Sequence, residues 1–507
     1  MRVRLNKLFS VVFFAVFSGL FILIINSGYV NESDRNTYNC TFYERQCIIA
    51  SLLLFTLVIT VAYFTYNRII DRSRFLKSVD KNYYVPLVII TACAFIFIFQ
   101  LASGFLLVCD PVTDVKILNG FSLDFAKNGN FNLVRTDYMD YYLVKYQNNF
   151  GALFIFSALY RLSYTLTGSI SVYLPIMLNA FAINISIVLT VFLSRSLFGD
   201  RKALFTLFLC SVFAPFYTYA AFYYTDSLSM PFIIGAVYLL AVVFKREFDY
   251  KKIILTVLCG VIIYLGFKVK GSLVILLVAG ILYAFLRLKP KRAAIIGLAL
   301  ALGFLFAGAA FSVNFNKSRI ISESLSERYR YPYTHWLMIG LKGYGHYNHK
   351  DSEFTRKFSN IELKTSANLK RINRRIEKYG GRGMIKHLVK KAVWTWEDGT
   401  YYISHHIENA LHKNTFHKYV LQDGERHFVF YAYSCAFQLF LILMMTVSAF
   451  KAIKNPEPGF MTLIRITVFG AFLFFLVWET RSRYLFNLTP LFILLAVDGI
   501  SFRLLKK

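Results

Sequence analysis

The sequence predicts an all-α polytopic membrane protein, and three observations lead to this prediction. First, 57% of the 507 residues are hydrophobic and the mean hydropathy is +0.50. Second, many apolar runs are about 20 residues long, which is the length that a helix needs to cross the hydrocarbon core of a membrane. Third, short basic segments separate alternate runs, as is typical of loops that stay in the cytoplasm.

The formal net charge of +29 does not indicate a nucleic-acid-binding protein. Lys and Arg lie mainly in short loops between apolar runs and in one long polar segment, where they set the membrane orientation. The first apolar run, "MRVRLNKLFSVVFFAVFSGLFILII", has no small-residue cleavage site after it, so we interpret it as a retained first span. Of the seven cysteines, only Cys40 and Cys47 are placed to pair outside the membrane, and no cysteine spacing resembles a zinc site.

The apolar runs predict about twelve transmembrane helices with both termini in the cytoplasm. The runs cover 8–26, 47–66, 84–108, 170–194, 202–222, 228–244, 252–267, 271–288, 293–312, 429–450, 460–479 and 484–500. Basic connectors follow every second run, which places all of these connectors on one side. A thirteenth run at 150–168 contains Arg161 and would reverse every later loop if it crossed the membrane. We therefore predict that it forms a juxtamembrane helix on the outer face.

Three long segments then face outward, at 27–46, 109–169 and 313–428. The third holds all nine histidines and three of the four tryptophans, which predicts a folded, mainly helical extracytoplasmic subdomain. No internal repeat is evident. The predicted organisation is a two-helix addition with a basic cytoplasmic loop at 1–83, a transmembrane core with the first outer loop at 84–312, the loop subdomain at 313–428, and C-terminal transmembrane helices at 429–507.

Two aspartates, Asp110 and Asp114, open the first outer loop directly after a predicted span. Because they are four residues apart, they share one helix face if the segment after Pro111 is helical. A carboxylate at such a boundary is partly desolvated and can accept a proton from a hydroxyl group, so both are candidate catalytic residues. The alternative is structural, because Asp110 before Pro111 is a good helix N-cap.

Basic side chains on the same side of the predicted membrane form a candidate phosphate-binding site. Lys145 precedes the juxtamembrane helix, Lys268 and Lys270 occupy a very short outer loop, and Arg481 and Arg483 follow the eleventh span. Guanidinium groups bind phosphate in a bidentate manner, and helix N-termini favour anions. The alternative for the lysines is snorkelling toward the headgroups, and for the arginines an ion-paired scaffold.

Further residues are predicted to contact the substrate. They are Tyr146 and Asn148 before the juxtamembrane helix, Asp226 in a short outer loop, His335 and Trp336 in the long loop, and Glu479 and Tyr484 after the eleventh span. His346 and His349 have a spacing that suits a metal, but no Cys or Glu completes a ligand set, so no metal site is predicted. Trp394 and Trp396 stand directly before two acidic residues, which suits either sugar stacking or packing of the loop on the lipid surface.

In their order along the chain, these motifs resemble those of the GT-C glycosyltransferases, a polytopic class that uses polyprenyl-phosphate sugars. The motifs are "DPVTD" at the end of a span, "FAKNGNF" at a helix end, "YYLVKYQNNFG" before the juxtamembrane helix, "YYTDS", and "WETRSRY". Gln147 departs from the pattern, because a proline often stands there. The resemblance covers 84–500. It is nearest to the protein mannosyltransferase and aminoarabinose lipid A transferase group and to wall-polymer glycosyltransferases of Gram-positive bacteria.

The resemblance implies a GT-C-like fold and transfer of a sugar from an undecaprenyl-type phosphate, with inversion, on the extracytoplasmic face. Asp114 is the preferred base, because its distance to Gly129 fits the family better than that of Asp110. The implied ligands of the donor phosphate are Lys145, Lys268, Lys270, Arg481 and Arg483.

The implied acceptor is a cell-wall polysaccharide or teichoic acid. No cofactor is required, and a divalent cation is an open alternative. Two other function classes also stay open. A transporter or flippase of lipid-linked saccharides predicts ionisable residues in the middle of the membrane and repeated halves. A wall-polymer polymerase or ligase predicts catalytic arginines and histidines in the outer loop.

Overall fold

Long apolar helices form the body of the structure, a computed structural model that describes residues 1–26, 42–72, 81–131, 141–245 and 249–500. Within these residues, the one β-type pairing outside the helices is an isolated antiparallel bridge between Cys109 and Ala410. Helices form because the backbone polar groups of a membrane segment must be satisfied within that segment. The prediction of an all-helical polytopic membrane protein is confirmed.

Nine helical segments of the described chain are long and apolar enough to cross a membrane. They are Arg2–Asn26 (α1), Glu44–Thr65 within α2 (Phe42–Arg72), Tyr83–Leu106 within α4 (Lys81–Leu106), Leu174–Phe198 (α8), Thr225–Lys245 (α11, Thr225–Leu228, and α12, Met230–Lys245), Tyr250–Val269 (α13), Pro290–Ser318 (α15), His427–Lys454 (α22), and Ser482–Ile500 (η4, Ser482–Leu488, and α24, Thr489–Ile500). Asp200–Ser211 (α9) and Pro215–Ala221 (α10, Pro215–Thr218, and η2, Tyr219–Ala221) are bent by 63° and make a tenth if the pair is one span.

The two other predicted spans, 271–288 and 460–479, fold as shorter apolar helices that are not among the nine candidate spans. Gly271–Leu273 is a separate 3₁₀ turn (η3), which leaves Val274–Arg287 to α14, and α23 covers Met461–Val477. A 14-residue helix is about 21 Å long, less than the roughly 30 Å hydrocarbon core. The described residues therefore hold nine or ten helices that are long and apolar enough to span the membrane, instead of about twelve.

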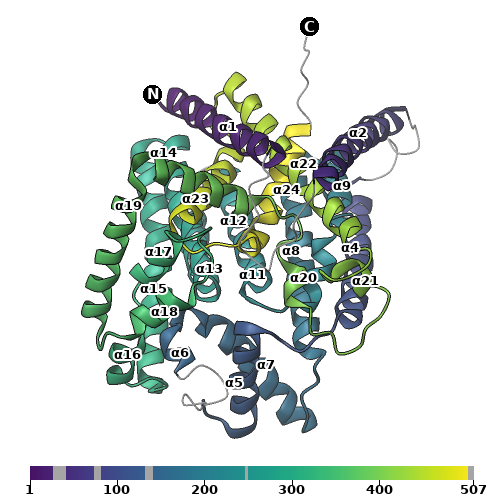
Figure 1. Ribbon diagram of the computed structural model, residues 1–507. Coiled ribbons are helices and arrows are strands. Elements are labelled where there is room, and N and C mark those ends of the chain that lie inside the picture. The colour runs from purple at the N-terminus through teal and green to yellow at the C-terminus, as the bar shows by residue number, and fades with distance from the viewer. Residues whose placement is uncertain (27–41, 73–80, 132–140, 246–248, 501–507) are drawn as a thin grey trace.

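The other elements are helices at the ends of, or beside, the spans (Figure 1). They are α5 (Thr113–Asn128), α6 (Tyr142–Lys145), η1 (Gln147–Asn149), α7 (Phe150–Thr167), α16 (Glu323–Tyr329), α17 (Thr334–Gly340), α18 (His349–Arg356), α19 (Ile361–Trp396), α20 (Ile403–His406) and α21 (His417–Val420). The thirteenth apolar run is thus a helix, α7, and it is not among the nine candidate spans. The long loop is mainly helical. The division into four regions stays a prediction, and Cys40 lies outside the described residues.

The two ends of the bundle carry different elements. We call the end with α5, α6 and α7 the loop end, and it lies opposite the N-terminus of α1 (Figure 1). At the other end, the terminal end, the Asn6 amide of α1 donates to the Pro456 carbonyl at 2.9 Å. Lys451 of α22 pairs there with Asp498 of α24. The start of α1 and the last turns of α22 and α24 therefore meet at one end, as the predicted topology requires.

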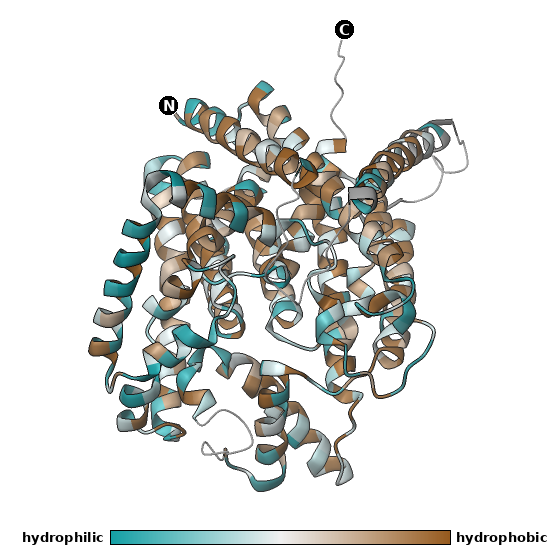
Figure 2. Ribbon diagram, viewed as in Figure 1, coloured by the Kyte–Doolittle hydropathy of each residue, from teal (hydrophilic) through white to brown (hydrophobic). Residues whose placement is uncertain are grey.

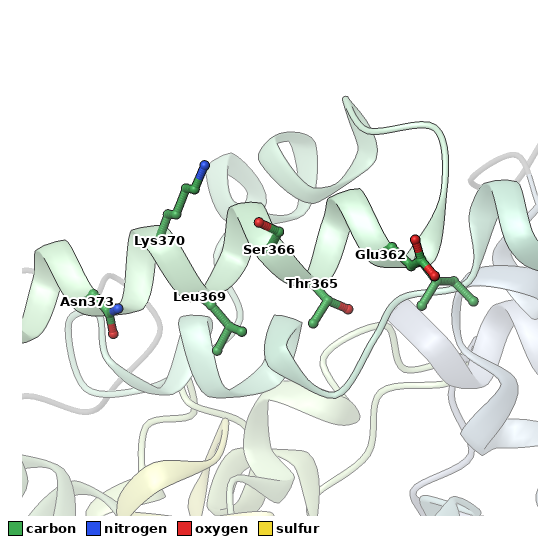
Figure 3. Close-up of a pocket in the computed structure, with 7 residues that line it drawn as sticks. Glu362, Thr365, Ser366, Leu369, Lys370 and Asn373 are labelled. Atoms are coloured by element: carbon green, nitrogen blue, oxygen red, sulfur yellow. The ribbon is translucent and has the colours of Figure 1, made fainter.

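The longest polar element is α19, a 36-residue helix with a kink at Gly380, whose φ is 58°. Figure 2 shows that this helix is largely hydrophilic, in contrast to the apolar bundle beside it. Figure 3 shows an open pocket on α19, lined by Ile361, Glu362, Thr365, Ser366, Leu369, Lys370 and Asn373. All seven lining residues belong to α19, so this pocket is separate from the predicted site residues.

Candidate functional site

Asp114 lies in the first turn of α5 at the loop end, directly after a residue with an unusual backbone conformation. Thr113 has φ 51°, in the left-handed region that β-branched residues rarely adopt. The helix starts at Thr113 and ends before Gly129, whose backbone N–H donates to the Phe125 carbonyl at 2.8 Å. The predicted helix end at a glycine is confirmed.

Asp110 lies before this helix, so the prediction that it shares a helix face with Asp114 is wrong. Its backbone N–H donates to the Asn409 carbonyl at 2.9 Å, next to the bridge between Cys109 and Ala410. This pairing with another loop keeps the chain extended here, which delays the helix until Thr113. Asp110 is also not the N-cap of α5, since Val112 holds that position without a side-chain hydrogen bond.

Three side chains from different elements surround the Asp114 carboxylate. Tyr142 of α6 donates its hydroxyl to Oδ1 at 2.7 Å, and Tyr224 donates to Oδ2 at 3.2 Å. Arg483 Nη2 lies 3.8 Å from Oδ2. The Asp114 side chain is 36% exposed, whereas that of Arg483 is only 10% exposed. A carboxylate that solvent can reach is therefore held by buried partners.

The two tyrosines are neutral hydrogen-bond donors. Burial raises the pKa of Tyr142 well above its usual value, and the charge of Asp114 raises it further. Burial and Asp114 also raise the pKa of Tyr224. Asn149 donates Nδ2 to the Tyr142 oxygen at 2.8 Å, so the hydroxyl of Tyr142 is fixed from both sides.

Strained backbone positions concentrate around this site. Thr113 (51°) and Tyr141 (57°) have positive φ, and so do Tyr401 (54°) and Tyr402 (64°), whose segment is tied to Asp398. The first two directly precede Asp114 and Tyr142. Such conformations cost about 1–3 kcal/mol each and are found where a functional arrangement constrains the backbone.

A second, buried ion pair lies next to the first. Lys270, in the turn after α13, pairs with Asp226 of α11. The Tyr484 ring lies between the two cationic groups, 4.9 Å from Lys270 Nζ and 5.2 Å from Arg483 Cζ. The structure thus joins in one cluster six residues that the sequence singled out in four separate motifs: Asp114, Asp226, Lys270, Glu479, Arg483 and Tyr484.

Glu479 belongs to this cluster through a hydrogen bond. The Tyr484 hydroxyl donates to Glu479 Oε1 at 2.9 Å. Burial raises the pKa of Glu479, while the Tyr484 hydrogen bond and Arg483 act in the opposite direction. The carboxylate is therefore held beside the arginine that contacts Asp114.

Predicted residues near α6 lie beside the cluster or point away from it. The Tyr146 ring is 4.9 Å from the Tyr142 ring, so it is a neighbour of the Asp114 site. Lys145 is buried, and its carbonyl accepts the Tyr331 N–H at 3.3 Å. Asn148 is exposed, whereas its neighbour Asn149 reaches Tyr142.

Three other predicted residues have partners elsewhere. Lys268 Nζ lies over the Phe311 ring, 4.1 Å from its centroid. His335 is buried and bonds through Nδ1 to Thr355 Oγ1 at 2.8 Å, and burial lowers its pKa to about 3. Trp336 stacks on Trp478, with ring centroids 5.7 Å apart.

Trp394 and Trp396 of the long loop pack in the interior. Trp394 stacks on Tyr344 at 5.2 Å, and Trp396 packs against Phe17 of α1 and Phe492 of α24 at 5.2 and 5.3 Å. The contacts favour a packing role over a sugar platform. No group of three or more His, Cys, Asp and Glu that could hold a metal ion occurs in the described part of the chain.

Sequence reasoning missed several residues of the site. Tyr142, Asn149 and Tyr224 lie inside the motifs that the sequence analysis singled out, but each stands next to another tyrosine or asparagine, and pattern alone does not distinguish neighbours. Asp398 accepts the Ser482 hydroxyl at 2.8 Å and so anchors the segment between the two arginines. Its signal in the sequence was only its position beside two tryptophans.

Fold and site together define an integral membrane protein with a cluster of carboxylates and cationic groups at one end of a helical bundle. The chain belongs to a family described as conserved hypothetical integral membrane proteins, whose family model matches residues 2–501. No curated protein sequence matches the chain.

Two solved structures show a distant likeness. The archaeal oligosaccharyltransferase AglB from Archaeoglobus fulgidus, in complex with an inhibitory peptide and a dolichol-phosphate, has 10% identity and a TM-score of 0.41, over 83% of this chain and 50% of that chain. ArnT from Cupriavidus metallidurans, bound to undecaprenyl phosphate, has 12% identity and a TM-score of 0.33, over 83% of this chain and 78% of that chain. The chain spans about half the length of the oligosaccharyltransferase that it matches.

Proposed function

We propose that the protein is a membrane glycosyltransferase that moves a sugar from a polyprenyl phosphate donor to a hydroxyl group of an extracytoplasmic acceptor. The observation that supports this most is the partly exposed Asp114 carboxylate, 3.8 Å from the buried Arg483 guanidinium. Such a transfer needs a base that the acceptor can reach, next to fixed positive charge for the departing phosphate. The support comes from these side chains and not from the distant likeness of fold.

The proposed step balances without a further reactant. Asp114 accepts the proton of the acceptor hydroxyl while the oxygen of that hydroxyl forms a bond to the anomeric carbon. On the opposite face, the bond between that carbon and the phosphate oxygen breaks, and the electron pair leaves with the lipid phosphate. The configuration at the anomeric carbon is therefore inverted. Arg483 compensates the charge that develops on the phosphate.

The proposed acceptor and the proposed side of the membrane rest on the sequence alone. The motif resemblance favours an undecaprenyl-type donor and a cell-wall polysaccharide or teichoic acid as the acceptor. The basic connectors favour a cytoplasmic terminal end, which puts the loop end outside. Comparison of the sugar composition of wall polymers from cells with and without the protein tests the acceptor, since a missing side-chain sugar identifies both donor and acceptor.

Asp114→Asn tests the reaction. Asparagine keeps the size of the side chain but cannot accept the proton, so sugar transfer from a polyprenyl-phosphate donor in proteoliposomes is expected to fall by about 10²- to 10⁴-fold. Asp110→Asn is the control variant. Because Asp110 lies outside the cluster, this variant is expected to lose far less activity. Unchanged transfer by Asp114→Asn contradicts the mechanism, and loss of transfer only with Asp110→Asn moves the base to Asp110.

A further inference from the structure

Asn149 stands at the N-cap position of α7, but its side chain does not cap the helix. It accepts no hydrogen bond from the first turn of α7, although an asparagine at an N-cap usually does. The residue is 4% exposed, so water does not satisfy the amide either. A buried amide that gives up the cap must have its partners elsewhere.

The partners of the Asn149 amide are the two tyrosines that bind Asp114. Nδ2 donates to the Tyr142 oxygen at 2.8 Å, and the Tyr224 hydroxyl lies 3.5 Å from Oδ1. Asn148 donates its own Nδ2 to the same Oδ1 at 3.2 Å. These three partners fix the orientation of the amide, with its nitrogen toward Tyr142 and its oxygen toward Tyr224.

Together with Asp114, these side chains close a ring of hydrogen bonds. Tyr142 donates to Asp114 Oδ1 at 2.7 Å, and Tyr224 donates to Oδ2 at 3.2 Å. The four members come from α5, α6, η1 and the N-cap of α11. Asn149 is the member that contacts both tyrosines, so it links the donors on the two oxygens of the carboxylate.

The ring treats the two carboxylate oxygens differently. A tyrosine has a single hydroxyl proton. Because the Tyr142 oxygen already accepts the Asn149 amide proton, its own proton is directed to Asp114 Oδ1. The Tyr224 proton has two acceptors within reach, Asp114 Oδ2 and Asn149 Oδ1. Oδ1 therefore keeps its donor, whereas the donor on Oδ2 can turn away.

We infer that Asn149 is a positioning residue that makes Oδ2 the oxygen of Asp114 that accepts the proton. The inference rests on the proposed function and deepens it, because it names the reacting atom and the residue that prepares it. The proton of the acceptor hydroxyl passes to Oδ2, and the Tyr224 O–H turns from Oδ2 to Asn149 Oδ1. No covalent bond of Tyr224 or Asn149 breaks. Without Asn149, the buried Tyr224 hydroxyl loses this second acceptor, and the turn becomes costly.

Asn149→Leu tests the role, because leucine has a similar size and removes both hydrogen bonds. The kcat and KM of sugar transfer are measured with the full-length protein in proteoliposomes, per folded protein. We expect kcat to fall about 10- to 100-fold, the effect of a misplaced catalytic group, while the KM for the polyprenyl-phosphate donor is unchanged.

Asn368→Leu is the matched control, since Asn368 is also a buried asparagine. Its amide bonds to Thr334 and Thr355 in the long loop. This variant is expected to lower the melting temperature and to leave kcat unchanged. Equal losses of kcat in Asn149→Leu and Asn368→Leu overturn the positioning role.

Tyr224→Phe tests the link between Asn149 and the donor on Oδ2. Both substitutions break the same hydrogen bond, so the double variant is expected to lose no more kcat than the weaker of the two single variants. Losses that multiply overturn the ring. If Asn149→Leu does not fold, Tyr224→Phe carries the test, because this variant must then lower kcat without a change in KM.

Chemical labelling of Asp114 tests the ring without any sugar. The Asp114 side chain is 36% exposed, so a water-soluble carbodiimide can reach it, and peptide mass spectrometry measures the modified fraction at one mildly acidic pH. The reagent attacks the protonated carboxyl group. Asn149→Leu frees the Tyr142 proton to leave Oδ1, so the anion is stabilised less and labelling is expected to rise several-fold. Asn368→Leu is expected to label at the wild-type rate.

The two measurements separate the inference from the proposed function. If the wild type transfers sugar and Asn149→Leu matches it in either kcat or labelling, the positioning role is wrong while the function stands. If the wild type transfers no sugar from any polyprenyl-phosphate donor but Asn149→Leu raises the labelling of Asp114, the proposed function fails and the ring stands.

Discussion

At the scale of single residues, the Asp114 carboxylate is positioned by donors from other elements. Tyr142, Tyr224 and Arg483 come from 28, 110 and 369 residues further along the chain, which is why local sequence does not reveal them. Local sequence also does not distinguish Lys268 from Lys270. The first lies over Phe311 and the second pairs with Asp226, and only the fold distinguishes them.

Replacing Tyr142 with Phe tests the positioning of the base. The change removes the 2.7 Å hydrogen bond to Asp114, so sugar transfer is expected to fall about 10- to 100-fold, the worth of roughly 1.5–3 kcal/mol for a bond to a charged group. Tyr141→Phe is the control, because Tyr141 stacks on Tyr329 at 4.1 Å and that stack survives. Equal transfer rates for the two variants contradict the assigned role.

Lys391 is expected to make the stability of the protein depend on pH. Its Nζ donates to the carbonyls of Gly340 and Trp478 at 2.7 Å each, which a neutral amine can also do. Burial lowers the pKa of Lys391 from 10.5 to about 7, against the opposing effect of Glu479. Because the folded pKa lies below the unfolded one, the unfolded chain binds more protons between these values, and stability rises with pH across this window.

The melting temperature in detergent is therefore expected to rise as the pH is raised from about 7 toward 10.5. Lys391→Met removes the titrating group and is expected to flatten this rise, at the cost of leaving two carbonyls without their donor. Lys390→Met, one residue earlier and less buried, serves as the control and should retain the slope. An identical slope in wild type and Lys391→Met shows that another group titrates.

At the scale of elements, apolar length predicted the spanning helices but not the polar ones. All twelve apolar runs form helices over most of their length, because a membrane segment has few other ways to satisfy its backbone. The polar helix α19 carried no comparable signal. It is held instead by buried charges such as Asp351, whose Oδ1 lies 2.6 Å from Arg375 and 3.3 Å from Arg371.

The contact between α7 and the C-terminal end of α13 depends on one glycine. A Cβ on Gly151 would lie 2.1 Å from the Lys268 carbonyl oxygen, so the two backbones approach closely only without a side chain. Gly151→Ala is expected to separate them, to lower stability by about 1–3 kcal/mol and to reduce sugar transfer, because Lys270 directly follows this end of α13. Scanning fluorimetry and the transfer assay measure both effects.

Gly381→Ala in α19 provides the control for this substitution. Nothing lies within 4 Å of a Cβ built there, so alanine is expected to leave the protein unchanged or slightly more stable. If Gly151→Ala has the same melting temperature as Gly381→Ala and transfers sugar at the wild-type rate, the close contact does not position the site.

At the scale of the whole molecule, the fold gathers the site at one end and many basic connectors at the other. The turn after α13 belongs to the site, so α14 starts at the loop end, and Arg287 lies in its last turn. The sequence predicted this segregation from charge alone. It did not predict which spans are adjacent, because apolar helices have few sequence features that determine which other helix they pack against in lipid.

Labelling of single cysteines tests which end faces the cytoplasm. Ser324 is exposed in α16 at the loop end, and Lys289 is exposed between α14 and α15 at the terminal end, so each is replaced by Cys. Because positive loops stay inside, a membrane-impermeant maleimide is expected to label Ser324→Cys in intact cells and Lys289→Cys only after the membrane is opened. The parent protein, with its native cysteines, gives the background. The reverse pattern would put Asp114 and Arg483 in the cytoplasm and exclude an extracytoplasmic acceptor.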